Sequence, residues 1–241
     1  MKRGLTLFGF VVLLALGSCW WVYPSASLRY EITVEVEADG QIYTGSSVHE
    51  VTLRRQPQLL DAPPVSRDFK GEAVAVDIAD RGTLFLLLTG TRGQSNEPFS
   101  PEHGYHVDPE QFVNVVFEIR ASSAQAVRSL PYRVIDDEVP FNQLPMMVRF
   151  DDISDPTTVA LVNPYDLAAR FGEGVQLRRV HVQTTRARVT DGIEERLPWF
   201  NTPHPPGTLS SGSIYGDRPR VHDFPPGHGV QFSNFRQGFR G

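Results

Sequence analysis

Residues 28 to 37 of the chain, LRYEITVEVE, alternate strictly between apolar and polar side chains. A period of two residues is typical of a β-strand with one face in a hydrophobic core and the other in water. The pair Asp39-Gly40 follows at once and predicts a hairpin, because glycine adopts a positive φ at no steric cost. We therefore expect an antiparallel sheet that begins near residue 28 and continues in a return strand over residues 41–54.

The return strand breaks its own pattern in one place. Its apolar positions slip out of phase between Val48 and Val51, which predicts a β-bulge near His49. Further strands are expected over residues 74–78, 83–90, 112–119, 145–150 and 175–190, and short helices near residues 122–130, 163–172 and 193–199. The predicted fold class is mainly β: an antiparallel β-sandwich-like single domain with two or three short helices, an α+β arrangement being the alternative.

The last 41 residues differ in composition from this domain. Residues 201–241 contain six prolines and seven glycines, a share typical of disordered segments. They also contain several aromatic side chains, which an inert tail does not need. We predict four segments: residues 1–18 as a signal peptide or membrane anchor, 19–27 as a tether, 28–200 as the β-rich domain, and 201–241 as a tail that docks on its own sheet.

The N-terminus has the features of an export signal. Lys2 and Arg3 precede an uncharged apolar run, and the run ends in small residues. The four residues Leu16-Gly17-Ser18-Cys19 then resemble the lipobox of bacterial lipoproteins. That resemblance implies that the thiol of Cys19 is alkylated with diacylglycerol and that the chain is cut just before it. Cys19 is the only cysteine of the chain and occupies the one position that the pattern requires.

Two other interpretations of the N-terminus remain open. The apolar run extends through Tyr23, which makes 19 residues or roughly 28 Å of helix, enough for an uncleaved transmembrane anchor. A signal cut near Ala26 would instead release a soluble protein. All three interpretations place the rest of the chain in the cell envelope, on the periplasmic or extracellular side of a membrane. With one cysteine, no disulfide can form within the chain, so the domain must depend on its hydrophobic core.

Net charge bears on the class of partner. Residues 24–200 carry 17 basic and 26 acidic side chains, a net charge of −9. Nucleic acids and anionic lipid head groups both attract basic patches, so this balance argues against either as a partner. A membrane reached through the N-terminus and a protein partner are the partners that remain.

Three groups of residues could carry chemistry. His103 and His106, in a polar loop, could bind zinc, although surface histidines are the simpler interpretation. Asp151, Asp152 and Asp155 follow a predicted strand and could bind Ca²⁺ or act as an acid–base pair, but their spacing departs from a calcium loop and favours turn formation.

The third group is Ser46, Ser47 and His49, residue types that a hydrolase uses. On a strand Ser47 and His49 merely share one face, so a cross-strand polar patch is the simpler interpretation. No phosphate-binding loop, zinc-protease motif or nucleophile elbow is present, and no cofactor is expected. The sequence thus predicts a membrane-tethered envelope lipoprotein that acts as a non-enzymatic interaction or scaffolding module. The alternative is an envelope hydrolase or metal-binding protein that uses Asp151 and Asp152 or His103 and His106.

Overall fold

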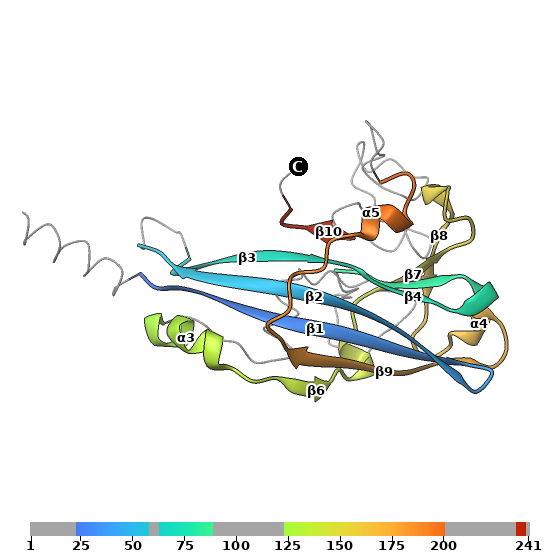
Figure 1. Cartoon of the computed structure of the whole chain (residues 1–241), viewed down its shortest axis with the longest axis horizontal. Helices are drawn as coiled ribbons and strands as arrows, with labels where there is room; N and C mark the ends of the chain where they lie inside the picture. The colour runs from blue at the N-terminus through green and yellow to red at the C-terminus, as the bar shows by residue number, and fades with distance from the viewer. Residues whose placement is uncertain (1–22, 58–62, 89–122, 201–234, 240–241) are drawn as a thin grey trace, which may run out of the picture.

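The computed structural model describes residues 23–57, 63–88, 123–200 and 235–239, and it folds them into two antiparallel sheets (Figure 1). The six-stranded sheet has the order β10-β3-β2-β1-β9-β6, and the four-stranded sheet has the order β4-β5-β7-β8. The mainly β prediction is therefore confirmed.

The strands of the larger sheet are β1 (Ser25–Ala38), β2 (Gln41–Arg55), β3 (Val65–Glu72), β6 (Asp136–Glu138), β9 (Val175–Thr184) and β10 (Arg236–Gln237). Those of the smaller sheet are β4 (Val74–Asp77), β5 (Thr83–Leu86), β7 (Met147–Phe150) and β8 (Val159–Val162). The helices are α3 (Ala124–Ser129), α4 (Ala168–Phe171) and α5 (Ile193–Arg196), with 3₁₀ turns η1 (Ala79–Arg81), η2 (Leu130–Tyr132), η3 (Phe141–Gln143) and η4 (Pro156–Thr158). Among the described residues, no helix has the length and apolar character needed to cross a bilayer.

The β1–β2 hairpin forms where the sequence predicts it. Its register runs without interruption from the pair Ser25–Arg54 to the pair Ala38–Gln41. The two turn residues between the strands have positive φ angles, 53° at Asp39 and 79° at Gly40. The turn chemistry of this pair therefore fixes the register of the whole hairpin.

The predicted bulge near His49 is wrong. The hairpin pairs Tyr30 with His49 and Glu31 with Val48 in continuous register. Val48 points away from the core between the sheets, yet it is only 6% exposed because another segment covers it. Backbone N–H of Val48 donates to the hydroxyl of Thr190 (2.8 Å), and backbone N–H of Thr190 donates to the carbonyl of Val48 (3.1 Å).

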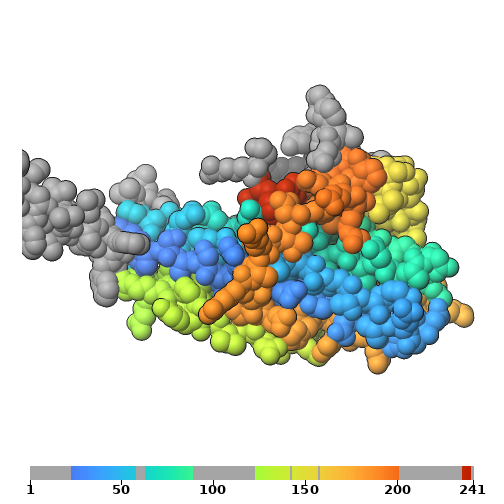
Figure 2. Space-filling model, in the orientation of Figure 1, coloured from blue at the N-terminus to red at the C-terminus, as the bar shows by residue number. Residues whose placement is uncertain are grey.

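That covering segment is the chain that follows β9. The sequence predicts one strand over residues 175–190, but β9 ends at Thr184. Residues 185–192, here called the strap, then leave the plane of the sheet and cross its outer face over β1, β2 and β3 (Figures 1 and 2). The strap begins with a hydrogen bond of 3.0 Å from the N–H of Thr185 to the carbonyl of Arg29, and it leads into α5.

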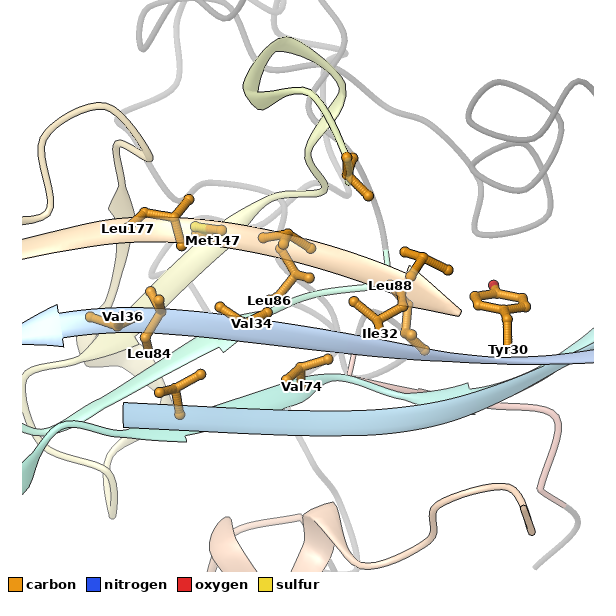
Figure 3. Close-up of a cluster of buried hydrophobic side chains, with 14 of the residues drawn as sticks. Tyr30, Ile32, Val34, Val36, Val74, Leu84, Leu86, Leu88, Met147 and Leu177 are labelled. Carbon is orange, nitrogen blue, oxygen red and sulfur yellow. The ribbon is translucent and has the colours of Figure 1, made fainter. Parts of the chain in front are cut away.

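The main core lies between the two sheets. The alternating apolar side chains of β1 point into it and meet those of the smaller sheet (Figure 3). Gly45 in β2 lies against β4 so closely that a Cβ atom there would be 2.1 Å from the carbonyl oxygen of Ala75. The separation of the two sheets at this point therefore depends on the absence of a side chain.

A second core covers the outer face of the smaller sheet. It joins side chains of that sheet to α5 and to residues 235–239, here called the C-terminal segment. Phe235 is fully buried there, and its ring lies 5.8 Å from Phe85, 5.9 Å from Phe150 and 5.9 Å from Trp199. The next two residues form β10 against β3. The prediction that the tail docks on its own sheet is thus confirmed for these five residues.

Candidate functional site

Glu72 joins three parts of the fold. It is the last residue of β3, and one residue later the chain enters β4 of the other sheet. Its side chain is 4% exposed, and its carboxylate Oε2 accepts hydrogen bonds from the backbone N–H groups of Gly192 (2.8 Å) and Ile193 (3.0 Å). Its backbone carbonyl accepts two more, from the hydroxyl of Ser47 (2.9 Å) and from Nε2 of His49 (2.8 Å). Glu72 therefore links the core face of β2 to the end of the strap.

His49 is a neutral structural side chain. Its ring is buried between the rings of Tyr30 (5.4 Å) and Phe69 (5.3 Å), in edge-on contact with both. Burial lowers its pKa to about 4, against the opposing effect of the hydrogen bond with the carbonyl of Glu72. A carbonyl only accepts, so Nε2 of the neutral ring carries the proton and donates it. Because Ser47 also donates to this carbonyl, the pair forms a polar patch within the core.

A groove lies beside Glu72, between β2, β4 and the end of the strap. We call it the Glu72 groove; its volume is about 530 Å³. Small residues of β2 and β4 line part of it, Ile42 and Tyr43 are its larger apolar residues, and hydroxyl-bearing residues of β2 and of the strap complete the lining. The lining residues are Ile42, Tyr43, Thr44, Gly45, Ser46, Glu72, Ala73, Ala75, Asp77, Thr190, Gly192, Ile193 and Arg196.

The two carboxylates of the groove are already engaged. Glu72 accepts the backbone hydrogen bonds described above, and Asp77 accepts from Arg196 (2.6 Å) and from the hydroxyl of Thr83 (2.8 Å). Burial favours a higher pKa at Asp77, but the hydrogen bonds from Arg196 and Thr83 and the charge of Arg196 hold the pKa below its ordinary value. Asp77 is thus an anion at neutral pH and has no proton to give as a general acid.

The aspartate cluster predicted after a strand lies in the loop between β7 and β8. Oδ1 of Asp152 accepts from the N–H (2.9 Å) and the hydroxyl (2.6 Å) of Ser154, and these bonds hold the pKa of Asp152 below its ordinary value. Asp151 pairs with Arg149 at 3.5 Å. The N–H of Asp155 donates to the carbonyl of Asp152 at 3.0 Å. These contacts close the turn between the two strands.

No metal centre occurs within the described ranges, where no three His, Cys, Asp or Glu side chains are grouped to hold an ion. Asp151, Asp152 and Asp155 are in this part of the chain and do not form such a group. His103, His106 and Cys19 lie outside the described residues, and the predictions made for them remain predictions.

The sequence gives no local sign of the Glu72 groove. Glu72 follows Gly71 in a stretch without alternation, and β3 itself was not predicted. The carboxylate acquires its role from Gly192 and Ile193, which lie 120 and 121 residues further along the chain. Only the short helix predicted near residues 193–199 points to this region, and α5 does begin at Ile193.

Comparison with known proteins gives no match from which a role of the groove could be inferred. No protein-family model, no curated protein and no solved structure matches the chain. The residues of the chain itself therefore carry the functional argument.

Proposed function

We propose that this protein is a lipoprotein of the cell envelope, tethered to a membrane through Cys19, whose β-sandwich acts as a non-enzymatic interaction module. The observation that carries the proposal is the position of β1. This strand begins at Ser25, six residues after Cys19, and those residues span at most about 20 Å when fully extended. A lipid on Cys19 would hold the sandwich directly beside the bilayer.

The interior of the sandwich supports a binding role. The space between the sheets is filled by interdigitating apolar side chains, and His49 is enclosed by aromatic rings rather than facing a cleft. The lining of the Glu72 groove includes hydroxyl-bearing and apolar residues, and its Asp77 is already paired to Arg196. Such a lining suits a polar segment of a partner, bound through hydrogen bonds, better than acid–base catalysis.

Photo-crosslinking in intact membranes tests the interaction role. A photoreactive residue placed at Ser46, which is exposed at the groove, is expected to give one discrete adduct with a second protein. The same residue at Asp80, exposed in η1 and outside the groove lining, serves as the matched control and is expected to give none. Absence of an adduct at Ser46, or equal labelling at both positions, would count against the groove as the interaction surface.

Membrane fractionation tests the tether. The wild-type chain is expected in the membrane fraction and to leave it only with detergent, because acyl chains partition strongly into bilayers. A Cys19→Ala variant is expected to retain its leader and to lose the acyl groups. Recovery of the wild-type chain in the detergent-free soluble fraction would contradict the proposal.

A further inference from the structure

The described charges are divided between the two ends of the sandwich. The end at which β1 starts, here called the anchor-proximal end, comprises residues 23–29, 50–57, 63–68, 123–134 and 185–188. It carries eight basic and two acidic side chains, a net charge of +6, whereas the other described residues carry eight basic and eighteen acidic ones, a net charge of −10. The basic residues of this end are Arg29, Arg54, Arg55, Arg67, Arg128, Arg133, Arg186 and Arg188.

Strand register brings these separate stretches to one end. Ser25 of β1 pairs with Arg54, and the neighbouring Leu53 of β2 pairs with Arg67 of β3. The start of the strap joins them through a hydrogen bond of 3.3 Å from Arg29 to the carbonyl of Ala187. In Figure 1, α3 lies beside the start of β1, at the opposite end from the β1–β2 turn and α4.

The two acidic side chains of this end each pair with one of its arginines. Glu50 pairs with Arg29 at 2.7 Å, and Asp68 pairs with Arg54. The acidic run over residues 136–138 belongs to β6, which continues along β9 away from the start of β1. The positive charge is therefore concentrated at the end from which the chain leads back to Cys19.

Two apolar side chains project from the same end. Tyr132 is 84% exposed and Val134 is 87% exposed, and Arg133 lies between them. A tyrosine beside an arginine is a typical pair for the head-group layer of a bilayer, where the ring is half in contact with apolar chains and the guanidinium contacts phosphate. Val134 lies about level with Arg29 of β1, and Arg29 is roughly 13 Å along the strand from Ser25. For Val134 to reach the bilayer, the sandwich must therefore tilt toward its α3 side.

We propose that the anchor-proximal end rests on the head groups of the bilayer that holds the anchor, with its arginines facing anionic lipid and with Tyr132 and Val134 entering the interface. The inference deepens the proposed function, since it presupposes the tether at Cys19. Its physical basis is independent of the anchor: each arginine near an anionic surface strengthens binding about five-fold, and the described residues of this end carry a net charge of +6.

Site-directed spin labelling of the full-length, membrane-reconstituted chain tests this orientation. One label is placed at Val134→Cys and a control label at Asp80→Cys, which is exposed at the far end of the sandwich. In vesicles of phosphatidylcholine with phosphatidylglycerol, the label at residue 134 is expected to be about three-fold or more better protected from a water-soluble nickel chelate than the control label. Charge reversal by Arg186→Glu with Arg188→Glu is expected to remove most of that protection. Arg170→Glu, in α4 at the opposite end of the sandwich, is expected to leave it unchanged.

The outcomes separate this inference from the tether. Equal exposure of the two labels in a chain that still floats with the vesicles would overturn the orientation and leave the tether intact. Flotation with anionic vesicles but not with neutral ones would support the basic surface and contradict the tether. Failure to float with either kind of vesicle would contradict both.

Discussion

Glu72 and Gly192 lie 120 residues apart and are joined by a hydrogen bond of 2.8 Å from the backbone N–H of Gly192 to Oε2 of Glu72. The N–H of Ile193 donates to the same oxygen at 3.0 Å. The carboxylate thus fixes the end of the strap and the start of α5 at the point where β3 leaves the larger sheet. Glu72 therefore holds the C-terminal end of the strap, while Arg29 and Val48 hold its start and its middle.

Replacing Glu72 is expected to free the C-terminal end of the strap and the start of α5. Glu72→Ala leaves two backbone N–H groups without their acceptor, and we expect the free energy of unfolding to fall by about 3 kcal/mol. Glu72→Gln keeps one acceptor oxygen and is expected to lose about half of that. Urea denaturation of the two variants measures the difference, and an alanine variant as stable as wild type would show that the two hydrogen bonds to the Glu72 carboxylate do not stabilise the fold.

Phe235 is expected to tie the C-terminal segment to the domain. The side chain is fully buried among aromatic rings, so Phe235→Ala should cost about 3–5 kcal/mol of stability. Phe239 is the matched control, because its ring is only half-buried. Its cation–π contacts are with Lys70, 4.4 Å from the ring centroid, and Arg236, 4.3 Å from it. Phe239→Ala should cost about 1 kcal/mol. Melting curves that rank the two variants in the reverse order would contradict the second core.

Gly45 is expected to tolerate no side chain. A Cβ atom there would lie 2.1 Å from the carbonyl oxygen of Ala75, and both groups belong to paired backbone that cannot move aside easily. We expect Gly45→Ala to destabilise the fold by about 3 kcal/mol. Gly192→Ala is the control: a Cβ atom at residue 192 has no other atom within 4 Å, and the backbone N–H can still donate to Glu72. Thermal unfolding of both variants checks this, and equal melting temperatures would argue against the close approach of β2 and β4.

The stability of the domain is expected to depend on pH through His49. Its pKa is about 4 in the folded protein and about 6.5 when exposed. Above pH 6.5 the ring is neutral in both states and the contribution to stability is complete. As the pH falls from 6.5 to 4, the unfolded chain binds a proton that the folded chain excludes, so stability falls by about 3 kcal/mol and then levels off.

A His49→Leu variant isolates this effect. Whatever the stability of the variant at neutral pH, its free energy of unfolding should lack the fall that His49 causes between pH 6.5 and 4. Carboxylates whose folded pKa is lowered, such as Asp77, give stability that is lost at lower pH in both proteins. Denaturant titrations at a series of pH values provide the comparison, and parallel profiles for wild type and variant would refute a neutral buried ring.

The local parts of the fold were predictable from the sequence. The β1–β2 hairpin follows from alternation and from Asp39-Gly40, and α3 is capped by Ser123, whose hydroxyl accepts from the N–H of Ala126 at 3.1 Å. In each case residues within a few positions of one another determine the geometry. The parts that depend on distant segments were not predictable. Val48 disrupts the alternation because the strap buries it, and a single sequence does not show which segment crosses a sheet.

The prediction that anionic lipid is not a partner also depended on information that only the fold supplies. A net charge averaged over the chain argues against anionic lipid, but the pairing of β1 with β2 and of β2 with β3 gathers arginines at one end. The Glu72 groove is likewise assembled from three separate stretches of chain. Composition therefore gives the average charge of the surface, whereas recognition depends on how the charged side chains are distributed over it.

The mass of the mature N-terminus, taken from protein extracted from the membrane fraction of cells that express the chain, tests the tether at Cys19 directly. We expect an N-terminal Cys19 that carries acyl groups, with residues 1–18 removed, and an unacylated chain from the Cys19→Ala variant. A wild-type chain that begins at Met1, or one cut near Ala26 without any lipid, would contradict the tether at Cys19.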